Sequence, residues 1–138
     1  MNCGTVFHDK NYQFRHGNAS PKLLIVLCEF GTNHLVLVTT SKPHSKSKRP
    51  GCQNTDTPPN YFLPKGSCWF DDDTWVQTDE IIELDSTIQG YEKKDGTGIE
   101  YKEVLPLSLM MSIIDCALQS DFIEEFYLEF LKKVRDKL

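Results

Sequence analysis

The pattern of apolar residues changes once along this chain, and that change limits the possible folds more than any other feature. From residue 4 to residue 85 the apolar residues come in short runs of strand length. From residue 106 onward they recur every three or four residues, as in amphipathic helices. Strands followed by helices predict an α+β domain, built on a small sheet or barrel of about five to seven strands.

The strongest strand signals are two neighbouring apolar runs. Residues 22–28 are apolar on both faces, which predicts a central strand. A turn at 31–33 follows, so residues 34–40 are expected to form a hairpin with that strand. Further strands are expected at 4–8, 61–64, 74–77 and 81–85, with 61–64 at an edge because Pro64 stops pairing. Loops are expected at 9–20, 41–60 and 90–98.

Two helices are expected near the C-terminal end. Pro106 and Ser108 mark the start of a helix over 107–118. Ser120 predicts the N-cap of a second helix from Asp121 onward, whose apolar stripe is interpreted as core or dimer contact. A chain of 138 residues fits a single domain, with a barrel core over about 4–90 and helices over about 106–137.

The sequence predicts a soluble cytoplasmic protein without a metal or cofactor. No run approaches the ~20 apolar residues of a membrane span, and the first residues lack a signal peptide's pattern. The five cysteines contain no C-x-x-C pair, so neither a zinc ribbon nor a disulfide framework is predicted. Cys28 and Cys116 are interpreted as small buried hydrophobic residues. A metal site that joins Cys52 and Cys68 to a histidine has no support from spacing.

The net charge of −5 hides a division along the chain. Residues 1–65 carry eight Lys and Arg against three Asp and Glu, whereas residues 66–138 carry seven against 17. A protein that coats nucleic acid is expected to be basic throughout, so only a local basic surface is predicted. The densest basic segment is 42–49, which is either a solvated loop or a loop that faces phosphate.

Three segments, in the right order, resemble the MazF/PemK family of toxins, which are small barrel-like endoribonucleases that act as dimers. The first is Gly4-Thr-Val-Phe-His8, followed by Lys22–Leu27, where the family usually reads Arg-Pro and an apolar run. The second is Val36–Ser41, which is similar to a family strand that ends in Thr-Ser or Thr-Thr. The third is Phe70–Asp85. Lys22 replaces the family's functional arginine, and the helix from residue 121 is additional.

The resemblance implies a small SH3-like or PemK-like β-barrel of about five to seven strands with C-terminal helices. It also implies metal-independent cleavage of single-stranded RNA by a homodimer that an antitoxin protein neutralises. In such cleavage the RNA 2′-hydroxyl attacks the phosphorus, so the protein must move two protons and stabilise negative charge. Carried over by position, Lys22 would hold the phosphate and Thr39 would bond a non-bridging oxygen or position the sugar. Lysine is a point charge where arginine is a bidentate fork, so a weaker grip is expected.

Histidine is the best candidate for acid–base catalysis near neutral pH. His8 ends the first strand, and His16 lies in the loop before the second, so both rank above His34 and His44. An extended strand would separate His34 from Thr39 by about 17 Å. The candidate RNA-binding residues are Arg15, Thr40, Lys42, Lys46, Lys48 and Arg49. The aromatic residues considered for base stacking are Tyr61, Phe62, Trp69 and Trp75, with at least one tryptophan expected in the core.

Two acidic groups fit this chemistry less well. Asp71–Asp73 would repel phosphate and are interpreted as a turn or a helix start. Glu83 and Asp85 share one strand face, the pattern of a paired-carboxylate hydrolase, but such residues more often face solvent. An alternative function is a catalytically silent barrel that binds protein or RNA. A gyrase-directed toxin on a related barrel is a third possibility, without support from individual residues.

Overall fold

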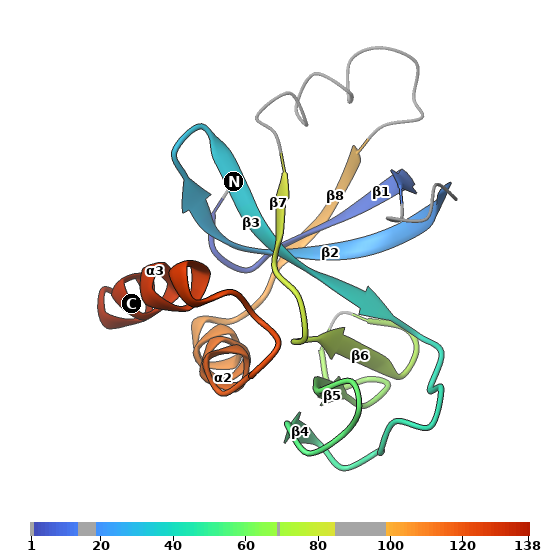
Figure 1. Ribbon diagram of the computed structural model, residues 1–138. Coiled ribbons are helices and arrows are strands. Elements are labelled where there is room, and N and C mark those ends of the chain that lie inside the picture. The colour runs from blue at the N-terminus through green and yellow to red at the C-terminus, as the bar shows by residue number, and fades with distance from the viewer. Residues whose placement is uncertain (1, 14–18, 69, 85–98) are drawn as a thin grey trace.

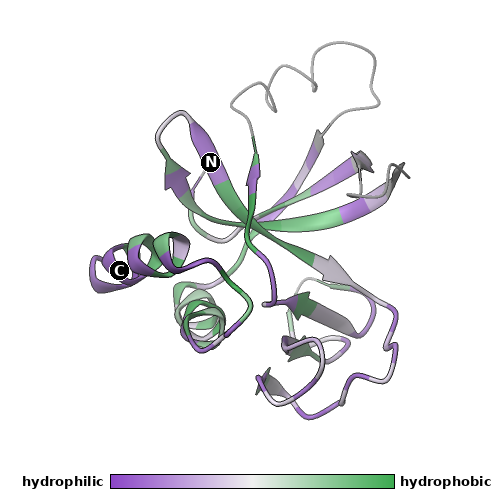
Figure 2. Cartoon of the chain, viewed as in Figure 1, coloured by the Kyte–Doolittle hydropathy of each residue, from purple (hydrophilic) through white to green (hydrophobic). Residues whose placement is uncertain are grey.

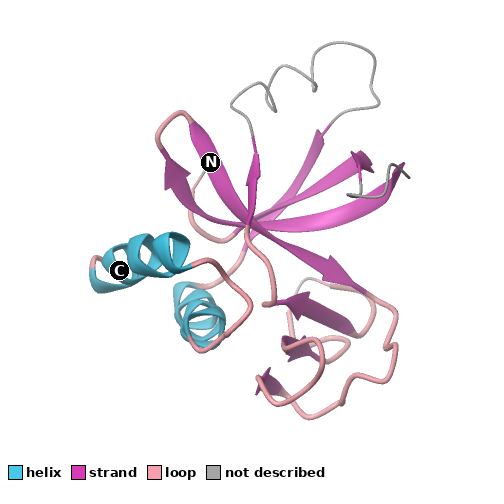
Figure 3. Ribbon diagram, viewed as in Figure 1, coloured by secondary structure: helices cyan, strands magenta, loops and turns pink. Residues whose placement is uncertain are grey.

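A computed structural model describes residues 2–13, 19–68, 70–84 and 99–138, as eight strands and two helices (Figures 1 and 3). The strands are β1 (Thr5–Gln13), β2 (Ala19–Phe30), β3 (Asn33–Thr40), β4 (Gly51–Gln53), β5 (Asn60–Leu63), β6 (Thr74–Gln77), β7 (Ile82–Leu84) and β8 (Ile99–Val104). The helices are α2 (Leu107–Leu118) and α3 (Glu125–Asp136). The α+β class is therefore confirmed.

All pairs of neighbouring strands run antiparallel, in the order β4-β5-β6-β3-β2-β1-β8. Strand β3 has two partners along the same edge, since β7 pairs with its first half and β6 with its last two residues. Figure 1 shows β4, β5 and β6 as a separate small layer at the end of β3. Within the described part of the chain β4 and β8 end the sheet without pairing with each other, so the sheet is not a closed barrel.

The central strand β2 divides the core into two apolar clusters. Ile25 and Leu27 belong to the larger cluster, which includes the buried sides of both helices. Leu24 and Val26 belong to a smaller cluster with Phe7 and the even-numbered valines of β3. This alternation follows from the two-residue period of a strand. Helix α2 packs against β4, β5 and α3, so the helices cover one side of the sheet (Figure 2).

Several predicted elements are confirmed and others need correction. The β2–β3 hairpin, the central place of β2 and the helix over Leu107–Leu118 are as predicted. The second helix begins at Glu125, four residues later than predicted, because the Ser120 hydroxyl instead accepts the Phe122 N–H within a turn (3.3 Å). Strands β4 and β8 were not predicted. β5 is not an edge strand, since β4 pairs with its outer side.

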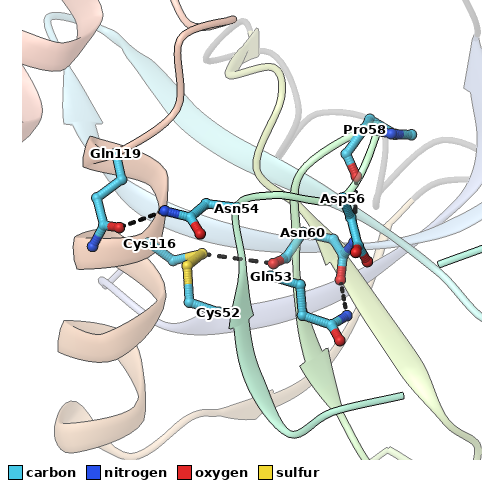
Figure 4. Close-up of a disulfide and its surroundings, with 8 residues drawn as sticks. All are labelled: Cys52, Gln53, Asn54, Asp56, Pro58, Asn60, Cys116 and Gln119. Atoms are coloured by element: carbon cyan, nitrogen blue, oxygen red, sulfur yellow. Dashed lines mark hydrogen bonds between the residues drawn. A yellow bond between two sulfur atoms is a disulfide. The ribbon is translucent and has the colours of Figure 1, made fainter. Parts of the chain in front are cut away.

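A disulfide joins Cys52 of β4 to Cys116 of α2, across 64 positions of sequence (Figure 4). The interpretation of Cys116 as a simple buried hydrophobic residue is therefore wrong, although its burial is confirmed at 1% exposure. Cys3, Cys28 and Cys68 are free thiols. Burial raises the pKa of Cys28 to about 12, which makes that thiol unreactive. Neither described helix is long and apolar enough to cross a membrane.

Candidate functional site

A cavity of about 270 Å³ lies beside the middle of β1, the first part of β2 and the end of β3, next to the bend before β6. Four residues predicted from the sequence line it, namely His8, Lys22, Thr39 and Thr40. The other lining residues are Pro21, Leu23, Ser41, Phe70, Asp71, Asp72 and Thr74. Its volume lies near the lower end of the roughly 300–1,000 Å³ typical of small-ligand sites. Residues from five separate stretches of the chain are thus brought to one concave surface.

Strand register explains how His8 and Thr39 reach the same cavity. His8 of β1 pairs with Leu23 of β2, and the next pair along, Leu24 with Val38, places Thr39 beside Leu23. The Thr39 hydroxyl donates a hydrogen bond to the Leu23 carbonyl (2.8 Å). Its proton is therefore already in use, and donation to a phosphate oxygen would break a bond between two strands. Thr39, which is 4% exposed, has a clear structural role at this place.

Thr40 is the better hydrogen-bond donor of the two threonines. Its hydroxyl oxygen accepts the Lys42 N–H (3.2 Å), which ends β3 and leaves the hydroxyl proton for another acceptor. Thr40 is 6% exposed and, like Thr39, lies on the cavity wall. A hydroxyl that accepts from the backbone and faces a cavity suits the binding of an anionic oxygen.

Lys22 is half-buried at the start of the cavity wall. Burial lowers the pKa of Lys22, and the positive charges of Lys42 and Lys46 lower it further. The ammonium groups of Lys42 and Lys46 therefore lie close enough to repel that of Lys22. A bound anion would relieve that repulsion, which is a physical reason for such a cluster to bind phosphate.

The basic loop after β3 is held by an internal polar network. Gln53 donates to the Ser47 carbonyl (2.8 Å) and the Asn60 side chain (2.6 Å), and the Trp75 indole also donates to the Ser47 carbonyl (2.9 Å). The Ser47 N–H and hydroxyl both donate to Asp56. Burial alone would raise the pKa of Asp56, but these bonds outweigh it and lower that pKa. Lys46, in this loop, is only 8% exposed.

The remaining candidate cations lie outside the cavity wall. Lys48 is exposed and pairs with Asp73 (3.6 Å), while Lys42 and Arg49 are exposed on the same loop. The predictions for Arg15 and His16 lie outside the described residues. His44 is exposed, and burial lowers the pKa of His34.

The aromatic residues considered for base stacking mostly have structural roles. Phe62 and Trp75 pack on each other in the interior, with ring centroids 4.9 Å apart and exposures of 3% and 1%. Trp75 is therefore the expected core tryptophan, whereas Trp69 lies outside the described residues. Tyr61 is half-buried against the main core. Phe70, which is 3% exposed, is the aromatic residue of the cavity wall.

Two carboxylates line the cavity that sequence reasoning did not assign to the site. Asp71 and Asp72 are both exposed, in the bend that precedes β6. They reach the cavity because β6 pairs with Thr39 and Thr40, a contact between distant parts of the chain. The cavity is therefore of mixed charge, with a lysine and a histidine facing two aspartates.

The other acidic pair does not form a described site. Glu83 of β7 accepts hydrogen bonds from Asn33 (2.6 Å) and from the Tyr127 hydroxyl (2.9 Å), while Asp85 lies outside the described residues. Within the described ranges no three His, Cys, Asp or Glu side chains gather as metal ligands would. No known family model matches the chain, and no curated protein matches it.

Proposed function

We propose that the chain is a metal-independent endoribonuclease of the MazF/PemK type, which cleaves single-stranded RNA at the cavity lined by His8 and Lys22. The observation that carries the proposal is that His8, Lys22 and Thr40 line one cavity. His8 supplies a general acid or base, Lys22 a cation and Thr40 a hydroxyl donor. RNA cleavage by the 2′-hydroxyl needs these three kinds of group. For this chain to be of the MazF/PemK type, its open sheet must be a variant of that family's small barrel.

The reaction follows from the groups in the cavity. A base takes the proton from the 2′-hydroxyl, and the 2′-oxygen attacks the phosphorus. The bond from phosphorus to the 5′-oxygen then breaks, an acid protonates that oxygen, and a 2′,3′-cyclic phosphate remains. We assign the base to an ionised Asp71 or Asp72 and the acid to protonated His8, while Lys22 stabilises the charge on the phosphoryl oxygens.

The exposed cations of the loop after β3 suit the RNA backbone on either side of the cut. Lys42 and Arg49 are exposed there and lie beyond the cavity wall. Lys46 acts through its charge, since it is almost fully buried and lies close enough to influence Lys22. We further propose that the protein acts as a homodimer in the cytoplasm and that an antitoxin protein neutralises it.

A second function is favoured by the acidic side of the cavity. Asp71 and Asp72 repel phosphate, and the hydroxyl proton of Thr39 is already donated to Leu23. Both features suit a binding module without catalytic activity. The two functions differ in whether bound RNA is cut.

The test is an end-mapped cleavage assay on a long RNA with excess chelator. Wild type is compared with Lys22→Ala and His8→Asn, and with the matched controls Lys132→Ala and His44→Asn, which lie outside the cavity. We expect 2′,3′-cyclic phosphate ends, with a loss of activity of about 10²-fold or more in His8→Asn. The controls should cut like wild type.

Three results would contradict this assignment. Equal cutting by all variants would move the activity away from the cavity. RNA that is bound but left intact would support the binding module. Cleavage that stops when chelator is added would refute the metal-independent mechanism.

A further inference from the structure

Two phenylalanine side chains are exposed to solvent, one in the turn before α3 and one in its first turn. Phe122 is 64% exposed and Phe126 is 50% exposed. Other aromatic residues of this helix are packed, since Tyr127 and Phe130 contact the ring of Phe30 with centroid distances of 5.8 and 4.7 Å. Neither Phe122 nor Phe126 belongs to the apolar core, although the Phe126 ring contacts the Tyr127 ring (4.1 Å). Both phenyl rings therefore keep half or more of their surface in water, at a free-energy cost.

The stretch of sequence that carries these rings has negative charges and no positive ones. Four exposed carboxylates lie within nine residues, and no Lys, Arg or His occurs from residue 103 to residue 131. The carboxylates are Asp121, Glu124, Glu125 and Glu129. Negative charge in the first turn stabilises a helix, which explains some of them. It gives no reason for exposed phenyl rings at the same place.

We propose that the acidic aromatic surface, made of Phe122 and Phe126 with these four carboxylates, docks a basic segment of another protein that also carries apolar side chains. A second copy of the chain is disfavoured as the occupant, because two such surfaces would bring like charges together. A basic partner would instead pair its cations with the carboxylates while its apolar side chains cover the rings.

The spacing of the rings fits an amphipathic partner helix. Phe126 lies four positions after Phe122, so their Cα atoms are at most about 14 Å apart. Apolar residues seven positions apart on a helix are separated by about 10 Å along its axis. One face of a short basic helix could therefore cover both rings. This surface lies outside the cavity wall, so the proposal does not depend on RNA cleavage.

The probe is a synthetic peptide of about 14 residues, all leucine or lysine, placed so that it forms an amphipathic helix. Such helices commonly bind a partner through their apolar face. Two control peptides replace all lysines by glutamate or all leucines by serine. Binding to the full chain is measured by calorimetry, and the contact is located from backbone amide shifts. The variant Phe122→Ser/Phe126→Ser is compared with Val104→Ser/Leu107→Ser, which alters residues of similar exposure at 54% and 53%.

We expect the leucine–lysine peptide to shift amides of residues 121–130 and to bind more weakly at high salt. The Phe122→Ser/Phe126→Ser variant should raise its Kd by about tenfold or more, while the Val104→Ser/Leu107→Ser variant should bind like wild type. Neither control peptide should bind as well as the probe. Equal binding by both variants, or binding of the glutamate peptide, would overturn the proposal. Phe122-dependent self-association without peptide binding would assign the surface to a second copy and also overturn it.

Discussion

Removal of the disulfide should lower the stability of this domain substantially while leaving it folded. The bond joins residues 64 positions apart, so it closes a long loop in the unfolded chain. Loop-closure entropy for that length corresponds to about 4 kcal/mol at 25 °C. A domain of this size is typically stable by about 5–15 kcal/mol, so the loss is large but survivable.

Cys52→Ser is the cleanest substitution for this test. Cys52 is exposed, whereas Cys116 is 1% exposed, so replacing Cys52 leaves the interior filled. Unfolding in urea is followed by circular dichroism without reductant. With a slope near 2 kcal/mol per molar, the midpoint should fall by about 2 M. Cys68→Ser, which removes a free thiol, should leave the midpoint nearly unchanged.

Reduction of the disulfide in wild type gives an independent measure of the fall in the urea midpoint. Reductant should shift wild type to the midpoint of Cys52→Ser and should not shift Cys52→Ser itself. If Cys52→Ser unfolds at the wild-type midpoint without reductant, the disulfide does not constrain the unfolded chain and the calculation is refuted. If reductant shifts both proteins equally, it acts somewhere other than this bond.

Two further predictions concern backbone strain and pH. Gly4→Ala should destabilise by about 2–4 kcal/mol, because φ is +87° and a new methyl would lie 2.9 Å from Met110 Cγ and 3.1 Å from the Leu105 oxygen. Gly31→Ala, at φ +63° with open space around it, should lose only about 1 kcal/mol, and thermal unfolding compares the two. Asp56→Asn should destabilise by about 1 kcal/mol at pH 7, kept small by partial solvation. The pKa of Asp56 is lower in the folded protein than in the unfolded chain, where it is near 4. The stabilisation of the fold by the Asp56 carboxylate is therefore fully present above that unfolded pKa and disappears as pH falls through the folded pKa. The difference from wild type in urea unfolding should therefore shrink below about pH 4; a constant difference would contradict the assignment.

The elements that sequence predicted best are those whose signal is local. β2 and β3 are continuous apolar runs, and α2 has a proline at its start and a regular apolar stripe. β8 was missed because Glu100, Lys102 and Glu103 interrupt its pattern, and its pairing partner β1 lies some 90 residues earlier in sequence. β4 has only three residues, too few for a pattern to be recognised. Both depend on partners that sequence does not reveal.

In the candidate site, too, some residues could be predicted from sequence, while others depend on contacts between distant parts of the chain. Lys22 and Thr39 were predicted from the family resemblance and His8 from its place in the first strand, and neighbouring strands do bring them and Thr40 to one cavity. Asp71 and Asp72 were interpreted as turn residues, which agrees with their bend but misses their place on the cavity wall. That placement depends on β6 pairing with the end of β3, across more than 30 positions. The partner of Cys52, 64 positions away, is equally hidden in sequence.

The disulfide and the cavity are connected through the loop that carries the basic residues. β4 is a three-residue edge strand, which by itself would hold that loop weakly. The disulfide fixes β4 to α2 at Cys116 (Figure 4). Gln53, next to Cys52, donates a hydrogen bond to the Ser47 carbonyl inside the loop. The loop in turn places Lys42 and Lys46 near Lys22. Disulfides persist in oxidising compartments, so the support that this bond gives to β4 depends on the redox state around the protein. In a reducing compartment the same chain would lose the covalent support for β4, and the repulsion of Lys22 by Lys42 and Lys46 would favour the separation of the loop from Lys22.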